Sequence, residues 1–324
     1  MSLSVLRAGL AMVVASFAWS ARLGAQSVPS SEYLYLWTAS ADSTEPDFLA
    51  VLDVTEDSIR YGRLVTTLPV PGAGNMPHHT EHEMPSDRQL FANGYAAGRT
   101  FIFDLTDPVR PRLAKEFGEV EGYHHPHSFL RLPDGNVLAT FQMRHGDDAM
   151  RPGGIVELTS AGEIVRARSA DVPGLDPETR VYSAGIVPEL DRIVTTTTDM
   201  DRDTRASRQL QIWRLSDLTP LHTITLPDGP AGDESLLTAE PRVLSDGRTV
   251  LVSTFTCSLY LMEGLESQAP SARLVASFPR KPDTYCAIPA VVGQYYLVTV
   301  PAWSAVVSLD VSDPAAPREI SRLT

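Results

Sequence analysis

The stretch DLTDPVRP at residues 104–111 recurs almost letter for letter as DVSDPAAP at residues 310–317. Each copy ends a run of apolar residues with Asp-Pro, which favours a turn between two strands. A second motif places Asp-Gly at a tight hairpin, where glycine can adopt positive φ, in RLPDGNVL at 131–138 and VLSDGRTV at 243–250. The repetition indicates that one β-unit is used several times along the chain.

Short runs rich in Val, Ile, Thr, Tyr and Phe fill most of the chain, and almost none of it has a helical period. The runs group into six sets of similar length, at residues 33–73, 74–120, 121–172, 173–229, 230–281 and 282–324. Repeats of this size with four strands each predict an all-β fold, a β-propeller. The first set shows only three obvious strands, which leaves the predicted number of four-stranded blades at six or seven.

The first 25 residues have the pattern of a secretory signal peptide. A basic residue, Arg7, precedes an apolar segment that is too short to span a bilayer, and small residues before Gln26 provide a cleavage site. A buried helix or a membrane anchor is the alternative interpretation. We expect residues 26–324 to form a single propeller domain, secreted or periplasmic, with no membrane insertion after removal of the signal.

The charge of the chain is acidic, with a formal net value of −13. Removal of residues 1–25 takes away two arginines and no acids and gives −15. This balance argues against nucleic acid and anionic membrane surfaces as partners. We expect a small-molecule substrate instead.

The chain contains two cysteines, Cys257 and Cys286. Each lies in a strand-like segment, and these segments belong to adjacent repeats. An oxidising compartment would permit a disulfide between them. Two buried thiols are the alternative, and the sequence leaves both open.

Histidine is distributed very unevenly. Six of the eight histidines lie in two short segments, HHTEH at 78–82 and HHPH at 124–127, and His222 is far from both. These segments fall on the first strands of the second and third sets. Since the first strand of a propeller blade lines the central channel, we expect the two segments side by side near one mouth of that channel. Imidazole is a common transition-metal ligand, so the pattern predicts a metal site.

The strand period suggests which histidines act together. Residues two apart point to the same face, so His125 and His127 should project together, as should His78 and His82. His79 and Glu81 would face the other way in a regular strand. The candidate metal ligands are His78, His79, His82, His125 and His127. A nitrogen donor set suits Cu(II), Zn or Ni; polar channel residues that bind only water are the alternative.

Other polar residues at the starts of inner segments are candidates for supporting roles. Glu81 and Glu240 are the candidates for orienting a metal ligand by a hydrogen bond, without binding the metal themselves. Tyr285 and Cys286 open the sixth set, and either could approach a substrate next to copper. A structural role is the alternative for each of these residues.

Several motifs together resemble the selenium-binding protein / methanethiol oxidase family. The segments YLYL at 33–36 and PDFLAVLD at 46–53 are similar to its opening blade, and His78-His79 stands where the family has paired histidines. PHSFLRLPDG at 126–135 is similar to its Pro-His-Thr-x-His-Cys-Leu-Pro-Asp-Gly segment, and Gly153-Gly154 matches its paired glycines. The resemblance extends from about residue 31 to 320.

The resemblance implies a propeller that carries out a copper-dependent oxidation of small thiols such as methanethiol, with oxygen as acceptor. The chain departs from the family pattern at Leu130, where the family has a histidine, and at Arg131, where it has a cysteine. Met84 and Ser86 occupy a stretch where the family has further cysteines. These departures argue against selenium binding through cysteine.

Three hypotheses follow from the sequence. The first is an exported copper-dependent oxidase of small thiols. The second is a non-enzymatic propeller that binds a metal or a protein. The third is a lactonase-like hydrolase, whose site would centre on calcium and acidic residues. Copper is therefore the expected cofactor, with zinc and calcium as alternatives.

Overall fold

The computed structural model describes residues 32–146, 150–200, 207–286 and 288–324. The predicted signal peptide, residues 1–25, lies outside the described residues. The described chain is almost entirely β, with two 3-10 turns, η1 (Pro188–Leu190) and η2 (Pro301–Trp303). Within these ranges, no helix has the length and apolar character needed to cross a bilayer.

The strands form six antiparallel sheets, each made of strands that follow one another in the chain. The first three sheets are β1 (Tyr33–Thr38), β2 (Pro46–Asp53), β3 (Leu64–Ala73); β4 (Pro77–Thr80), β5 (Gln89–Gly94), β6 (Arg99–Asp104), β7 (Arg112–Phe117); and β8 (Tyr123–Arg131), β9 (Val137–His145), β10 (Met150–Leu158), β11 (Ile164–Ser169). The last three are β12 (Ala184–Val187), β13 (Arg192–Thr196), β14 (Gln209–Arg214), β15 (Pro220–Thr225); β16 (Thr238–Val243), β17 (Val250–Thr254), β18 (Ser258–Glu263), β19 (Ser271–Ser277); and β20 (Ala290–Val292), β21 (Tyr295–Val300), β22 (Ala305–Asp310), β23 (Arg318–Leu323).

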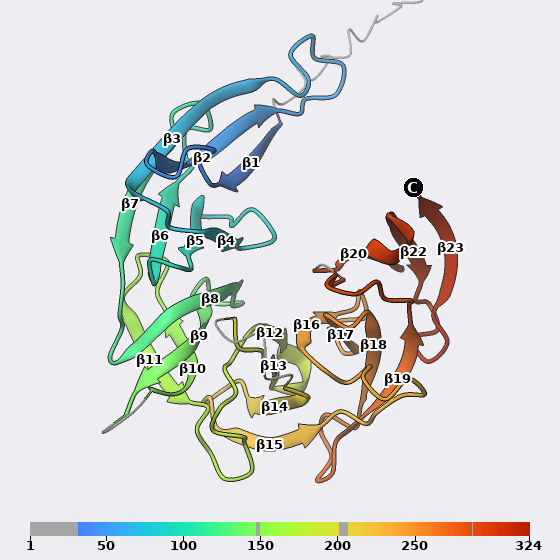
Figure 1. The fold of residues 1–324 in the computed structure, drawn as a ribbon. Coiled ribbons are helices and arrows are strands. Elements are labelled where there is room, and N and C mark those ends of the chain that lie inside the picture. Colours follow the sequence, from blue (N-terminus) through green and yellow to red (C-terminus); the bar gives the residue numbers. More distant parts are fainter. Residues whose placement is uncertain (1–31, 147–149, 201–206, 287) are drawn as a thin grey trace, which may run out of the picture.

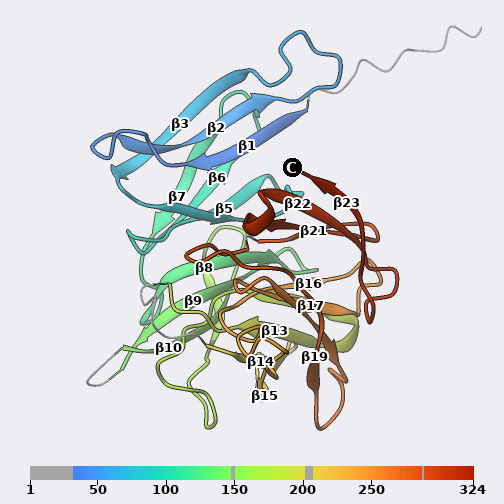
Figure 2. The same ribbon diagram turned by 45° about the vertical axis from the view of Figure 1, so that its right-hand side comes forward.

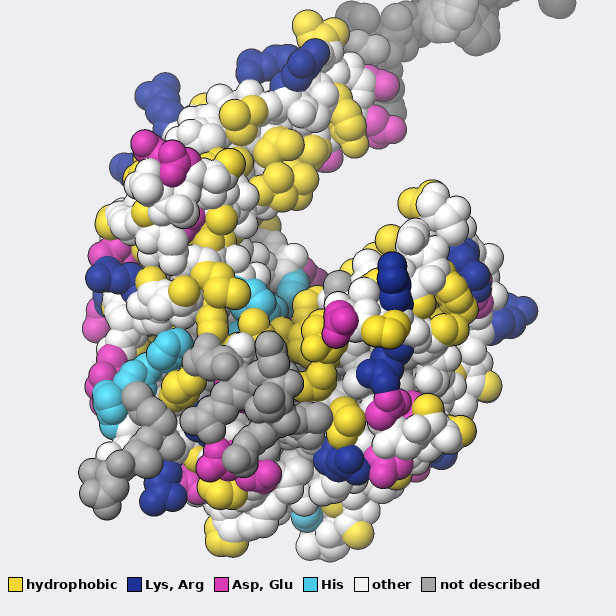
Figure 3. Space-filling view, in the orientation of Figure 1, with side chains coloured by type: hydrophobic (Ala, Val, Ile, Leu, Met, Phe, Trp, Pro, Cys, Tyr) yellow, Lys and Arg dark blue, Asp and Glu magenta, His cyan; other side chains and the backbone are white. Residues whose placement is uncertain are grey.

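The sheets are arranged as the blades of a propeller, which confirms the predicted fold. They follow one another around a common centre with β4, β8, β12, β16 and β20 on the inside (Figure 1). The space-filling view shows this centre as an open channel (Figure 3). Each sheet lies within one of the six predicted repeats, and the first has three strands in the described chain. The arc is open between the first and the sixth blade (Figures 1 and 2).

Large apolar side chains fill the interfaces between neighbouring blades. Phe91 and Ile102 of the second blade share a cluster with Phe129 and Phe141 of the third, and the Phe91 and Phe129 ring centroids are 5.7 Å apart. These side chains point sideways from their sheets because strand residues alternate between two faces. Full burial of such a side chain contributes about 1.5–3 kcal/mol. Packing between blades therefore fixes the inner strands relative to one another.

The predicted turns are present. At the Asp-Gly hairpins, Gly135 has φ 92° and Gly247 has φ 70°. At the Asp-Pro turns, the Asp107 carboxylate accepts a hydrogen bond from the Val109 amide, and Asp313 accepts one from Ala315 in the same way.

The paired glycines of β10 are required by close backbone approach. A Cβ at Gly153 would collide with the carbonyl oxygen of Phe141 on β9, and one at Gly154 would collide with that of Arg168 on β11. Glycine therefore permits the tight packing of the third blade.

Cys257 and Cys286 form a disulfide, with their Cα atoms 5.0 Å apart. Cys257 lies in the turn between β17 and β18, and Cys286 precedes β20, so the bond joins the fifth blade to the sixth. Of the two alternatives that the sequence left open, the structure has the disulfide.

Candidate metal centre

Three histidines from two neighbouring blades come together at the centre of the arc. Ligand nitrogens of His78, His79 and His127 all lie within 4.8 Å of one another. The Nε2 atoms of His78 and His127 are 3.0 Å apart, and the His79 and His127 ring centroids are separated by 4.3 Å. Two imidazole nitrogens bound to one ion at about 2.0–2.1 Å can be at most about 4.2 Å apart. The separation of the His78 and His127 Nε2 atoms, 3.0 Å, is within this limit. We call this group the histidine triad.

The expectation that His79 faces away from His78 is wrong because β4 is not a regular strand. Met76, just before it, has φ 57°, and the pairing of β4 with β5 shifts register between Pro77 and Thr80. A bulge of this kind removes the strict alternation of side chains. Two consecutive histidines therefore reach the same site.

His125 and His82 do not join the triad, contrary to the predicted set. His125 has φ 54°, and β8 shifts register between Pro126 and Phe129, so His125 and His127 are not on one regular face. The Tyr95 ring lies close to both, with centroids 5.6 Å from His125 and 6.0 Å from His127. His82 follows β4 and is exposed.

Asn93 holds the two histidine-bearing segments together. Its side-chain oxygen accepts a 2.6 Å hydrogen bond from the His79 amide, and its side-chain nitrogen donates a 2.8 Å bond to the Pro126 carbonyl. Asn93 is fully buried on β5. Because a buried amide loses free energy unless its partners are in place, these two bonds fix β4 against β8.

Burial keeps the triad imidazoles neutral. It lowers the pKa of His127 and of His79 well below the usual histidine value. Neighbouring histidines, and Arg242 in the case of His79, lower both further. Burial also lowers the pKa of the half-buried His78. Neutral imidazoles have a free lone pair for a cation, so the donor set fits a transition metal.

A chain of hydrogen bonds connects His127 to a buried carboxylate. The Ser183 hydroxyl donates to Oε2 of Glu240 at 2.6 Å, and the Ser128 hydroxyl donates to Ser183 at 3.2 Å. Ser128 lies 3.2 Å from Nδ1 of His127. Since both serine protons point toward Glu240, Ser128 accepts from Nδ1–H of His127. The lone pair of His127 is then on Nε2, which faces the triad.

Glu240 is therefore connected to the triad through two serines, on the Nδ1 side of His127. It has no exposed surface, and burial raises its pKa. Arg242, 3.5 Å away, and the bond from Ser183 act in the opposite direction and favour the carboxylate. Ser128 has no signal in the sequence other than its place beside His127, so its role could not be predicted.

Glu81 has a different role from the one predicted. Its two carboxylate oxygens accept hydrogen bonds at 2.9 Å from Nε and Nη2 of Arg131, and it also accepts the Phe91 amide. This bidentate pair joins the second blade to the third. Arg131, noted as a departure from the family motif, is thus a structural partner of Glu81.

Two aromatic residues cover the triad. The Tyr182 ring centroid is 3.9 Å from that of His127, and the Tyr95 ring is 5.9 Å from that of His78. Burial and the nearby Glu240 raise the pKa of Tyr182 well above its usual value, so its phenol stays protonated. Gln142 accepts the Tyr95 hydroxyl hydrogen bond and holds that ring in place.

The predicted catalytic pair lies away from the triad. Cys286 is bonded to Cys257, so it has no free thiol with which to approach a substrate. Tyr285 is 52% exposed and contacts the Phe255 ring, which in turn contacts Tyr182. Two rings therefore separate Tyr285 from His127.

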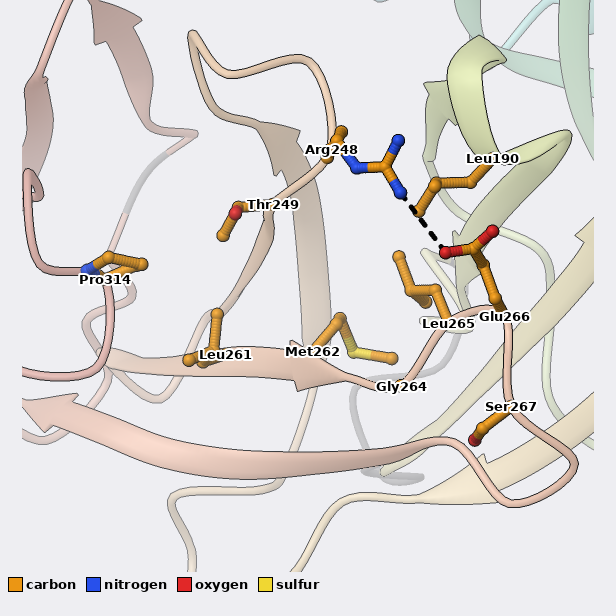
Figure 4. Close-up of a pocket in the computed structure, with 10 residues that line it drawn as sticks. All are labelled: Leu190, Arg248, Thr249, Leu261, Met262, Gly264, Leu265, Glu266, Ser267 and Pro314. Atoms are coloured by element: carbon orange, nitrogen blue, oxygen red, sulfur yellow. Dashed lines mark hydrogen bonds and ion pairs between the residues drawn. The ribbon is translucent and has the colours of Figure 1, made fainter.

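Two recesses of similar size differ in chemistry. One, of about 640 Å³, is lined in part by Glu81, His82 and Arg242 and lies beside the inner strands. The other, of about 620 Å³, is lined by residues of the fourth to sixth blades and includes an Arg248–Glu266 ion pair (Figure 4). Only the first of these two includes a histidine and approaches the channel.

No family model matches the chain. The chain is 27% identical over 218 residues to a methanethiol oxidase from Hyphomicrobium sp, and the match covers 61% of this chain and 49% of that protein. It is 30% identical over 136 residues to selenium-binding protein 2 of Arabidopsis thaliana, which covers 36% of this chain and 28% of the relative. The chain thus matches half or less of the length of these curated relatives. The resemblance predicted from the motifs is confirmed.

Solved structures show the same fold. A hypothetical selenium-binding protein from Sulfolobus tokodaii superimposes with a TM-score of 0.74 at 18% identity, covering 90% of this chain and 74% of that chain. A periplasmic gluconolactonase from Pseudomonas aeruginosa superimposes with a TM-score of 0.60 at 14% identity, covering 91% and 83%. At these identities the likeness concerns the propeller fold.

Proposed function

We propose that this chain binds copper through His78, His79 and His127 and oxidises a small thiol, with oxygen as the acceptor. The observation that carries the proposal is the convergence of the histidine triad. Its paired histidines also occupy the place of the paired histidines in the methanethiol oxidase motif. The similarity to a methanethiol oxidase over 61% of the chain supports the same substrate class.

Each part of the site has a task that follows from its environment. The three neutral imidazoles supply nitrogen lone pairs, and bound copper would supply one-electron redox chemistry. The serine chain from Glu240 presents the Nε2 lone pair of His127 to the triad. Tyr182 packs on the His127 ring and excludes water from one side of it.

The recess lined by His82 and Arg242 is the place that we assign to the incoming thiol. It is the recess beside the inner strands, and the Arg242 guanidinium would favour an anionic thiolate over the neutral thiol. With Cys257 and Cys286 paired, the chain itself offers no thiol to compete with the substrate.

Metal analysis of the purified protein, combined with an oxygen-uptake assay on methanethiol, tests the proposal. We expect close to one tightly held copper per chain after dialysis and thiol-dependent oxygen consumption. His78→Ala should abolish both, whereas His222→Ala, on the outer strand β15, should keep both. Tightly bound calcium with lactone hydrolysis would support the hydrolase instead. Absence of metal and of activity would support a non-enzymatic propeller.

We also propose that the protein is exported to the periplasm or secreted. The pattern of residues 1–25 and the Cys257–Cys286 disulfide both agree with an oxidising compartment. N-terminal sequencing of protein from the periplasm or medium should begin at Gln26. Recovery of the chain only in the cytoplasm, starting at Met1, would contradict export.

A further inference from the structure

A second group of potential ligands lies apart from the histidine triad. Ligand atoms of Glu119, His124 and His145 are all within 4.8 Å of one another. Oε2 of Glu119 is 3.0 Å from Nε2 of His145, and the ring centroids of His124 and His145 are 3.9 Å apart. In Figure 3 one group of histidines lies in the hollow of the arc and another on its outer flank. We call the group of Glu119, His124 and His145 the rim cluster.

Backbone hydrogen bonds hold the rim cluster in place. Val120 and Tyr123 exchange two hydrogen bonds of 2.9 Å across a tight turn, which brings Glu119 beside His124. The His145 amide donates to the Gly122 carbonyl at 2.9 Å, so the end of β9 is fastened to the same turn. The three side chains therefore come from one turn and two paired strand ends, with little freedom to separate.

The rim cluster also has an unused ligand atom and space beside it. Nε2 of His124 is buried and has no hydrogen-bond partner. A recess of about 460 Å³ is lined by Glu119, His124 and small residues such as Gly98 and Gly118. A buried nitrogen without a partner costs free energy, and a bound cation would remove that cost. Arg99, which also lines this recess, is paired with Glu116 at 2.6 Å.

We propose that Glu119, His124 and His145 form a second metal site, for a transition-metal dication such as Cu²⁺ or Zn²⁺. Two imidazoles and one carboxylate suit these ions, whereas Ca²⁺ and Mg²⁺ require a shell of oxygen ligands. Glu119 and His145 are about half exposed, with 48% and 54% of their side chains accessible. The ion at this site therefore exchanges with solvent more readily than one in the buried triad. The site stands independently of the proposed oxidase function.

The experiment is a Zn²⁺ titration of the full mature chain by calorimetry, repeated with Cu²⁺ and followed by electron paramagnetic resonance. A His78→Ala background reduces the triad to two imidazoles and isolates the rim cluster. In that background we expect one ion to bind. Addition of His145→Ala or Glu119→Gln should weaken this binding at least tenfold. Glu121→Gln removes the same charge two residues away and should leave it unchanged.

Three outcomes would overturn the rim site. In the first, neither His145→Ala nor Glu119→Gln weakens metal binding. In the second, Glu121→Gln weakens it as much as they do. In the third, the His78→Ala protein is folded by circular dichroism but binds no ion. His124→Ala provides a further check if His145→Ala unfolds. In the otherwise wild-type chain, His145→Ala should release one of two titratable ions. Thiol oxidation should persist in that variant, so failure of the rim site and failure of the oxidase proposal give different results.

Discussion

The Nε2 atoms of His78 and His127 lie 3.0 Å apart, although the two histidines are 49 positions apart in the chain. One comes from the inner strand β4 and the other from β8. In neutral imidazoles at this distance, Nε2–H of His78 donates a hydrogen bond to Nε2 of His127. With the His78 proton on Nδ1 instead, both Nε2 lone pairs would be available to a common cation. The relationship exists because two neighbouring blades present the same part of their first strands to the channel.

His127→Gln should remove most of the copper affinity. His127 is fully buried, and glutamine keeps much of its volume while removing the imidazole nitrogen. Loss of a residue that only orients a metal-binding side chain lowers the metal affinity roughly 10–100-fold. Loss of the metal-binding side chain itself should therefore lower it more. Copper per chain and a binding titration measure this. His222→Gln is the matched control, and equal copper loss in both variants would reject the triad as the site.

Disruption of the serine chain should weaken copper binding about tenfold without removing it. Ser183→Ala breaks the connection between Glu240 and Ser128 with no change of charge, and Glu240→Gln replaces the carboxylate by an amide that can also donate. Either change frees His127 to move its proton to Nε2. Glu83→Gln, an exposed acid on the recess beside the inner strands, is the control. Unchanged affinity in Ser183→Ala would show that the chain does not orient His127.

Stability of the metal-free protein should fall as the pH drops below about 6.5. Burial lowers the pKa of His79 and His127 in the folded state, so the unfolded state binds more protons in this range. The free energy of unfolding then decreases with falling pH, by roughly 2–3 kcal/mol per pH unit for two such groups. Urea unfolding at pH 7, 6 and 5 measures the slope.

His127→Gln should reduce that slope by about 1.4 kcal/mol per pH unit, because one buried imidazole is gone. His222→Gln should leave it unchanged. A slope that is the same in all three proteins would mean that other groups cause the acid sensitivity.

Removal of the Cys257–Cys286 disulfide should destabilise the protein by about 3–4 kcal/mol. The bond closes a loop with a sequence separation of 29, and the loss of chain entropy in the unfolded state sets this magnitude. Comparison of Cys257→Ser/Cys286→Ser with the oxidised wild type by urea unfolding measures it. A difference below about 1 kcal/mol would show that blade packing alone holds the last two blades together.

The fold could be predicted from local signals. The Asp-Pro and Asp-Gly motifs place turns at fixed points in each repeat, and each described sheet lies within one predicted set. These signals are reliable because a turn depends on a few adjacent residues, such as Gly135 with its positive φ. The sequence leaves the disulfide open, since the distance between Cys257 and Cys286 depends on how two blades pack.

The site could be predicted only as a region. The sequence located the two histidine segments on neighbouring inner strands but assigned them by regular alternation. The bulge in β4 and the positive φ of His125 break that alternation. His79, a candidate ligand that regular alternation would turn away from His78, therefore joins the triad, and His125 does not. Glu81 pairs with Arg131 for a similar reason: its partner is 50 residues away and is chosen by packing.

The sequence by itself therefore determined the repeat, the turns and the enrichment of histidine at the channel, because each depends on residue types at short spacing. Only the tertiary structure decided that Ser128 and Ser183 connect His127 to Glu240, and that Glu119 meets His145 at the rim. Apart from the contact between the adjacent His127 and Ser128, those contacts join residues 26 to 57 positions apart. Their geometry depends on backbone bulges and on the packing of one blade against the next, which a local pattern does not encode.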